Sequence, residues 1–108
     1  MGLNIISFNV NGLRETKKRE GVFQWLREQN CAIVLLQETH CSMHELDLWT
    51  KEWEGKAYWS NGSSSSKGVA CLIQPKLDIN VQNSVTDFNG RYLNLDIAFD
   101  ETKISLFI

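Results

Sequence analysis

Two apolar runs, separated by a helical pattern, dominate the first part of the chain. Residues 3–9 and 31–37 are each apolar enough to fill a buried strand, and each run stops abruptly at polar side chains. Near-continuous apolar character is typical of parallel strands covered on both faces. If a crossover helix joins the two strands, they lie parallel and adjacent, and their polar ends meet at the carboxyl edge of one sheet.

The segment between these strands has the spacing of an amphipathic helix. Val22, Trp25 and Leu26 recur at three- and four-residue intervals, which predicts a helix with one apolar side. Thr16 is the candidate N-cap and Asn30 the candidate stop. We expect Trp25 to lie in the core.

A second helix is predicted after the second strand. Ser42 and Glu45 have the spacing of a capping box, and the helical pattern ends near Gly55. One side of this helix carries the apolar residues Leu46, Trp49 and Trp53. The two tryptophans are therefore expected in the core.

Short strands and turns follow the second helix. Clean alternation of apolar residues in the last two strands indicates that one face is buried. Turns are predicted at Gln74 to Lys76 and at the Asn89-Gly90 pair. Trp59, beside a polar hairpin, is a candidate for stacking on a nucleic-acid base. The predicted strands span residues 56–60, 68–74, 77–85, 91–99 and 103–108.

Composition adds limits to this picture. The chain has 108 residues, 43% of them hydrophobic and 22% charged, which suits one domain. Its net charge of -2 provides no global attraction to nucleic acid. The three cysteines are an odd number, which favours reduced core residues over a disulfide framework. Because no apolar run reaches membrane length and the start lacks signal-peptide features, we expect no membrane association and an intracellular location.

Candidate chemistry lies where the two apolar strands end. Asn9 and Asn11 follow the first strand, and Glu38 and His40 follow the second. Carboxylate and carboxamide oxygens suit a hard cation such as Mg²⁺ together with a phosphate, and suit a covalent nucleophile less well. The pattern therefore predicts an active site at the carboxyl edge of the sheet.

Three segments in this order resemble a known family. They are residues 9–14 (Asn-Val-Asn-Gly-Leu-Arg), 36–40 (Leu-Gln-Glu-Thr-His) and 67–70 (Lys-Gly-Val-Ala). Together they resemble the endonuclease/exonuclease/phosphatase superfamily, most closely the endonuclease domain of LINE-type retrotransposons and next the apurinic/apyrimidinic endonucleases. The resemblance implies an α/β (α+β) fold, a mixed β-sheet with flanking helices that forms half of a four-layer αββα sandwich. Residues 1–108 would be a single domain, the N-terminal half of the family fold.

The resemblance also assigns roles to individual residues. It implies Mg²⁺-dependent (or Mn²⁺-dependent) hydrolysis of DNA phosphodiesters. Glu38 matches the principal metal ligand, and Asn9 matches the asparagine that helps to organise metal and phosphate, so both are candidate catalytic and metal-binding residues. Asn11, Arg14 and His40 match the nucleic-acid-facing rim, and Asn11 stands where apurinic endonucleases carry an aspartate.

The resemblance covers only part of an active site. Family members run to roughly twice a 100-residue unit. Their second half carries a Tyr-Ala-Pro-Asn loop, an Asp-x-Asn pair and a terminal Asp-His, which supply the general base and a phosphate-polarising histidine. We therefore expect the isolated chain to be inactive as a nuclease.

Other functions are compatible with parts of the pattern. A dinucleotide-binding module would need Gly-x-Gly-x-x-Gly after the first strand, and only Gly12 is present there. His40, Cys41 and His44 resemble zinc ligands but have no fourth ligand at suitable spacing. A family member that acts on small phosphate esters and a truncated, non-catalytic protein remain alternatives.

The end of the chain predicts an assembly. The last strand continues to Ile108, which suggests a missing C-terminal half or a partner chain. We expect the chain to supply about one sheet with its helices, leaving one apolar sheet face uncovered. Two copies packed sheet on sheet would cover such a face, so a homodimer is expected. The face would be built from Leu93, Leu95, Ile97, Ile104 and Leu106.

Overall fold

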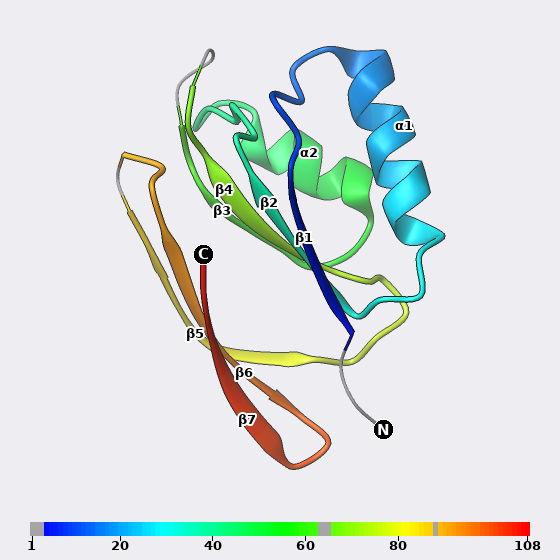
Figure 1. The fold of residues 1–108 in the computed structure, drawn as a ribbon, viewed down its shortest axis with the longest axis vertical. Helices are drawn as coiled ribbons and strands as arrows, with labels where there is room; N and C mark the ends of the chain where they lie inside the picture. Colours follow the sequence, from blue (N-terminus) through cyan, green and yellow to red (C-terminus); the bar gives the residue numbers. More distant parts are fainter. Residues whose placement is uncertain (1–3, 63–65, 88) are drawn as a thin grey trace.

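The computed structural model describes residues 4–62, 66–87 and 89–108. In these ranges the chain forms two helices and seven strands, and both helices precede the third strand (Figure 1). In chain order they are β1 (Ile5–Asn9), α1 (Thr16–Arg27), β2 (Ile33–Gln37), α2 (Leu46–Trp53), β3 (Ala57–Ser60), β4 (Val69–Ile73), β5 (Asn80–Thr86), β6 (Leu93–Phe99) and β7 (Thr102–Phe107).

Strands β1 to β4 form the first sheet, in the order β1-β2-β4-β3. β1 and β2 are parallel, with Ile5 opposite Ile33 and Asn9 opposite Gln37, and α1 connects them. The predicted strand, helix, strand unit is therefore confirmed. β4 runs antiparallel to both β2 and β3, so its first residue, Val69, lies beside Gln37 at the carboxyl edge.

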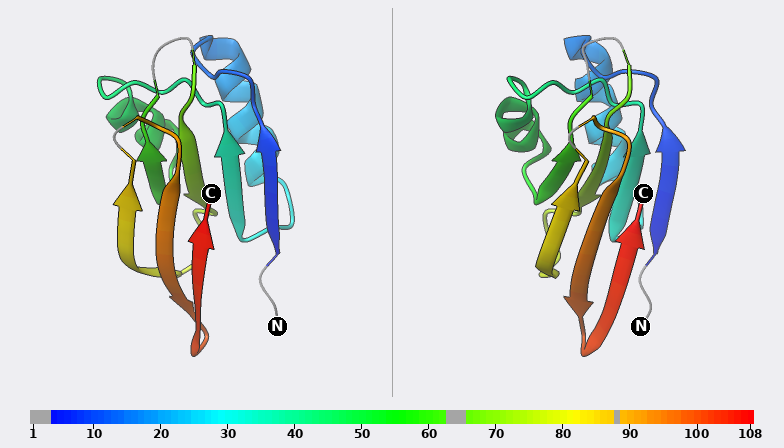
Figure 2. Two further views of the ribbon diagram at one scale, coloured as in Figure 1. Left: turned by 60° about the vertical axis from the view of Figure 1, so that its left-hand side comes forward. Right: turned by 90° about the vertical axis from the view of Figure 1, so that its left-hand side faces the viewer.

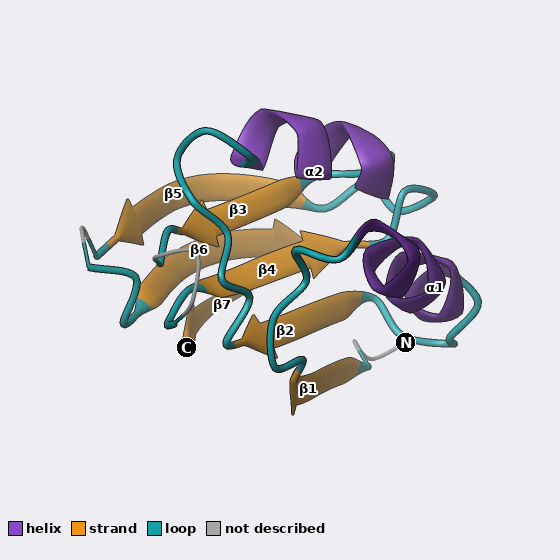
Figure 3. Ribbon diagram, turned by 90° about the horizontal axis from the view of Figure 1, so that it is seen from above, coloured by secondary structure: helices purple, strands orange, loops and turns teal. Residues whose placement is uncertain are grey.

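Strands β5 to β7 form a second, antiparallel sheet, in the order β5-β6-β7. It packs against one face of the first sheet, and both helices cover the other face (Figure 3). The expectation that the chain holds about one sheet is wrong, because its later strands fold back over the earlier ones. Three layers of an αββα arrangement are thus present.

Two apolar cores hold these layers together. One lies between the helices and the first sheet, and it includes Phe23, Leu36, Trp49 and Trp53. The other lies between the sheets, and it includes Ile33, Cys71, Ile73 and Ile79. Leu93, Leu95 and Ile97 are completely or almost completely buried in this second core, and Ile104 and Leu106 pack against it. The predicted uncovered face of these five residues is therefore wrong.

The open side of the sandwich lies at β1 and β7. Both are edge strands, and Figure 2 shows them on the same side of the molecule. β5 and β6 contact β3 and β4, so the second sheet leaves the inner face of β1 uncovered. Ile5, Ser7 and Asn9, which alternate with the helix-facing residues of β1, are accordingly exposed.

Both predicted helix starts need correction. Glu15, and not Thr16, is the N-cap of α1: its backbone is extended and its carboxylate accepts hydrogen bonds from the Lys17 and Lys18 amides. The helix also ends at Arg27, before Asn30. Ser42 and Glu45 do interact, but in the turn preceding α2, where the Ser42 hydroxyl donates to Glu45 Oε1 at 2.8 Å.

Among the described residues, no helix is long and apolar enough to cross a membrane.

Two of the four tryptophans lie differently from the prediction. Trp25 is 51% exposed because its helix face lies over the edge strand β1, where the Phe8 ring packs edge-on against it. Trp59 is 8% exposed, and its indole N–H donates to Thr50 Oγ1 at 2.7 Å. Its ring packs on Trp49, so it is not available for stacking on a base.

Candidate functional site

The carboxyl ends of β1 and β2 continue as paired loops. Val10 N donates to Gln37 O at 3.0 Å, Gly12 N to Glu38 O at 2.7 Å and Leu13 N to Thr39 O at 3.0 Å. Asn9 and Glu38 are therefore fixed at the same edge, as the parallel arrangement predicts. The loops that follow β3 and β5 reach this edge as well.

Glu38 presents its carboxylate at this edge. Its backbone is left-handed, with φ 57°, and its side chain is 44% exposed. Glu38 Oε2 accepts a hydrogen bond from Lys67 N at 2.9 Å, and His40 Nε2 lies 3.4 Å from the same oxygen. Two separate loops thus position an accessible anionic oxygen ligand.

The two asparagines of the first loop act together. Asn9 Oδ1 accepts a hydrogen bond from Asn11 N at 2.8 Å, which closes a local turn. Asn11 has a left-handed backbone, with φ 51°, a conformation that asparagine tolerates better than most residues. Asn9 is therefore held by the amide of Asn11, and Glu38 is held separately by that of Lys67.

Close packing of His40 requires a glycine at position 12. A Cβ on Gly12 would lie 2.7 Å from His40 Nδ1, and Gly12 has φ 87°. The imidazole is only 17% exposed and sits between the Gly12 backbone and the Glu38 carboxylate. The structure thus brings His40 to the candidate metal ligand, and its predicted contact with nucleic acid remains a prediction.

Arg14 is paired within the chain. Its guanidinium donates to Glu45 Oε1 and remains 44% exposed. Partial burial opposes ionisation of Glu45, but hydrogen bonds from Ser42 and the Arg14 guanidinium outweigh it and lower the pKa of the carboxyl group. Arg14 therefore lies on the rim in an ion pair, where a phosphate would compete with Glu45.

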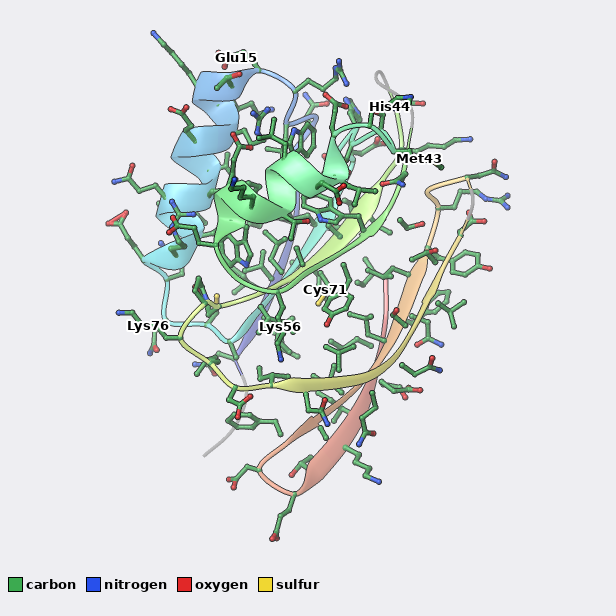
Figure 4. All side chains as sticks on the ribbon, turned by 180° about the vertical axis from the view of Figure 1, so that it is seen from behind. Glu15, Met43, His44, Lys56, Cys71 and Lys76 are labelled. Carbon is green, nitrogen blue, oxygen red and sulfur yellow. The ribbon has the colours of Figure 1, made fainter. Side chains whose placement is uncertain are left out.

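The loops after β3 and β5 complete the edge. His40 N donates to Lys67 O at 2.9 Å, and Gly68 N donates to Gly90 O at 2.9 Å. The Asn89-Gly90 turn predicted from the sequence is thereby joined to the Glu38 loop. In Figure 4 the labelled Met43 and His44 mark this end of the molecule, and Lys76 lies toward the other end.

The cysteines are core residues. Burial raises the pKa of Cys41 to about 12, with Glu45 adding to the effect, and burial raises the pKa of Cys71 to about 12. All three cysteines are free and buried. Within the described ranges, no cluster of three or more His, Cys, Asp or Glu side chains could hold a metal.

Sequence reasoning missed the contributions of Lys67 and Asp87. Lys67 acts through its backbone amide, which leaves no signature beyond the neighbouring glycine. Asp87 and Asn89 have the letters of an Asp-x-Asn pair, but the Asp87 carboxylate is bound to Arg91. Its position in the β5–β6 connection makes it part of the rim.

The fold and the residues at its carboxyl edge define a class of protein. It is a two-sheet sandwich covered by helices, with amide and carboxylate groups at the carboxyl ends of its parallel strands. Residues 6–108 match the Endonuclease/Exonuclease/phosphatase family. The chain belongs to this family, so the resemblance seen in the three sequence segments is confirmed.

Two relatives are similar in sequence. The transposon TX1 uncharacterized 149 kDa protein of Xenopus laevis is 29% identical over 97 residues, which are 90% of this chain and 7% of that protein. An exodeoxyribonuclease of Bacillus subtilis is 33% identical over 58 residues, which are 54% of this chain and 22% of that protein. The chain therefore spans less than a quarter of the length of these relatives.

Two solved structures share the fold. A humanized D. rerio TDP2 superposes with a TM-score of 0.70 at 19% identity, covering 97% of this chain and 48% of that one. The AP endonuclease LMAP from Leishmania major superposes with a TM-score of 0.67 at 17% identity, covering 95% of this chain and 38% of that one. The α+β arrangement of two sheets and two helices thus matches less than half of each.

Proposed function

We propose that this chain takes part in the divalent-metal-dependent hydrolysis of DNA phosphodiesters, with Glu38 as its metal ligand. The observation that carries the proposal is the fixed, accessible carboxylate of Glu38 at the carboxyl edge beside Asn9. Membership of the Endonuclease/Exonuclease/phosphatase family supports the same chemistry.

The residues at the edge fit a hard cation. A carboxylate and a carboxamide are the oxygen donors that Mg²⁺ and Mn²⁺ prefer. Such an ion, when bound, would neutralise charge that builds up on the phosphoryl oxygens. Lys67 N and His40 would keep the Glu38 carboxylate oriented, and Asn9 would contribute its amide on the neighbouring loop.

Within this function, we favour a retrotransposon-type endonuclease. The similarity to the transposon TX1 protein extends over 90% of the chain, which supports this assignment. The alternative within the same family is a protein that acts on small phosphate esters. A truncated, non-catalytic protein is the second alternative.

Glu38 would supply a metal ligand, and the resemblance assigns the general base to the family's second half. Among the described residues, no group of three or more His, Cys, Asp or Glu side chains is placed to hold a metal ion. A metal ligand alone leaves the attacking water without a general base. We therefore expect no nuclease activity from the isolated chain, and we propose that the missing groups come from further chain or a second copy. Work on DNA would place the protein in the nucleus.

Binding of Mn²⁺ to the isolated chain tests the metal site without requiring activity. Paramagnetic broadening of amide NMR signals should centre on residues 38–40 and 9–11. Glu38→Gln should weaken Mn²⁺ binding by about tenfold or more, since groups that merely orient a ligand are already worth about 10-fold to 100-fold. Its melting temperature should stay close to that of the original protein, because the exposed glutamine can still accept from Lys67 N.

Controls separate the metal site from nonspecific binding and from folding effects. Glu20→Gln changes an exposed carboxylate on α1 and should leave Mn²⁺ binding unchanged. Plasmid nicking should be absent for the isolated chain, and in a longer protein containing it Glu38→Gln should remove Mg²⁺-dependent nicking. Equal Mn²⁺ affinity of the original protein and Glu38→Gln would contradict the assignment.

A further inference from the structure

A second charged pair, Asp87 and Arg91, lies at the same edge as Glu38. Asp87 is 9% exposed, and its Oδ2 accepts hydrogen bonds from Arg91 N at 3.0 Å and Arg91 Nε at 2.9 Å. Ser60 Oγ donates to Asp87 O at 2.7 Å and accepts from Asp87 N at 3.1 Å. A buried carboxylate anchored to the end of β3 therefore holds the Arg91 side chain, which is 62% exposed.

This anchoring leaves the outer part of the guanidinium available. In the described part of the chain, Arg91 bonds through its backbone N and its Nε. The remaining donors, on Nη1 and Nη2, form a planar fork that matches two oxygens of a phosphate. Because Asp87 already restricts the side chain, binding of a phosphate would cost less side-chain entropy.

Hydrogen bonds between two loops connect Arg91 to Glu38. Gly90 O accepts a hydrogen bond from Gly68 N. Lys67, which precedes Gly68, donates its backbone amide to the Glu38 carboxylate. Gly90 also packs so closely against Asn61 that a Cβ there would strike the Asn61 backbone. Arg91 thus has a fixed position relative to Glu38 but lies in the connection between two strands of the second sheet.

Exposed cations consequently flank the candidate metal ligand. Arg14 lies on the β1 side of Glu38, whereas Lys67 and Arg91 follow on the side of β4 and the β5–β6 connection. A small phosphate ester bound at Glu38 would have one phosphate for all of them. A polynucleotide offers successive phosphates along its backbone, so it could occupy several cations at once.

We propose, building on the proposed function, that Arg91 binds a phosphate other than the one cleaved and thereby selects a polynucleotide over a small phosphate ester. Asp87 and Ser60 are positioning residues that aim the guanidinium. Arg91 is a binding residue and takes no part in the chemical step.

The test measures binding of a fluorescein-labelled DNA duplex of about 20 base pairs by fluorescence anisotropy over a range of salt concentrations. Arg91→Ala should weaken binding by about fivefold to tenfold and reduce the slope of log K against log salt by about one. Arg91→Lys keeps the charge and should retain the salt slope but bind more weakly, because it lacks the fork. Lys76→Ala removes an exposed cation at the other end of the molecule and should change neither quantity.

A second probe identifies the phosphate that Arg91 contacts. Binding of a nucleoside monophosphate in the presence of diamagnetic Mg²⁺, followed by the amide NMR signal of Glu38, should be unaffected by Arg91→Ala. The proposal would be overturned if Arg91→Ala lost monophosphate binding and duplex binding equally. It would also be overturned if Arg91→Ala bound the duplex as tightly as the original protein does. Failure of the proposed function gives a different result, since Mn²⁺ would then leave the signals of residues 38–40 unchanged. If Arg91→Ala does not fold, Arg91→Lys and its salt slope decide the matter.

Discussion

At the scale of single residues, left-handed backbone is concentrated where the candidate site lies. Asn11, Glu38, His40 and Lys67 all have φ between 51° and 63°, although none is a glycine. Such conformations cost of order 1 kcal/mol or more each and persist only where the surroundings enforce them. Here the enforcing contacts are the hydrogen bonds between the four loops, which therefore stabilise the placement of Glu38.

Gly68 is expected to be sensitive to a single added methyl group. Its φ is 95°, and a Cβ would collide with Thr39 Oγ1, which is buried. Gly68→Ala should therefore lower the free energy of unfolding by about 1–3 kcal/mol. Urea denaturation followed by tryptophan fluorescence measures this change.

Gly21 provides the matched control. It lies within α1, and a Cβ there would meet nothing within 4 Å. Gly21→Ala should raise the free energy of unfolding by about 0.5–1 kcal/mol through helix propensity. Equal effects of the two alanine substitutions would contradict the packing described for the Gly68 loop.

At the scale of elements, the Arg14–Glu45 pair couples the loop after β1 to the start of α2. A carboxyl group whose folded pKa lies below its ordinary value of 4.5 stabilises the fold above that pH. Its contribution is lost as the pH falls through the lowered value. Glu45→Gln should thus reduce stability by about 0.2–1 kcal/mol at neutral pH, and its difference from the original protein should vanish in acid.

Urea unfolding at several pH values between neutrality and about pH 3 measures this effect. Glu20→Gln alters an exposed glutamate of α1 outside the Arg14–Glu45 pair, and it should change stability little at any pH. A constant difference between Glu45→Gln and the original protein across the range would show that the ion pair contributes nothing.

The sequence predicts most elements of this fold and part of the site. Strand positions follow from apolar runs because burial selects those residues directly, and the parallel pairing of β1 and β2 follows from the helix between them. The packing of the second sheet on the first was missed, because it depends on contacts between distant segments. Trp25 was misplaced since helical spacing identifies an apolar side of a helix without showing that an edge strand leaves part of it uncovered.

The sequence predicts Asn9 and Glu38 at one sheet edge, where the structure has them, because strand ends are visible in the sequence. The support of Glu38 by Lys67 N was not predictable, since every residue except proline carries a backbone amide. The Asp87–Arg91 pair shows the same limit. Its two residues are close in sequence, but their connection to Glu38 passes through Gly68 and Gly90.

At the scale of the whole molecule, the uneven widths of the two sheets leave two open edges on one side. Among the described strands, β7 and β1 each have an outer edge that pairs with no other strand, and open edges favour pairing with another chain. Phe107 is 72% exposed at the end of β7 and stacks on Tyr92, which is 37% exposed. We expect two copies to associate through this side, and not through the buried face between the sheets.

Sedimentation velocity at micromolar concentration tests this association. Phe107→Lys should shift the protein toward monomer, because it replaces an exposed aromatic ring with a charge at the edge. Lys103→Ala, an exposed substitution on the same strand, should have little effect. A stable monomer at every concentration would refute the association.

The hydrogen bonds of the carboxyl-edge loops also bear on chemical ageing. Asn11-Gly12, Asn61-Gly62 and Asn89-Gly90 are the pairs most prone to deamidation, in which the glycine amide nitrogen attacks the asparagine side chain. In this fold each of these nitrogens donates a hydrogen bond, to Glu38 O, Cys41 O and Asp87 O respectively. Each deamidation would add a negative charge at the edge proposed to bind phosphate. The folded state therefore protects these asparagines from deamidation and so preserves the charge at the edge. A protein that unfolds more often should lose this protection sooner.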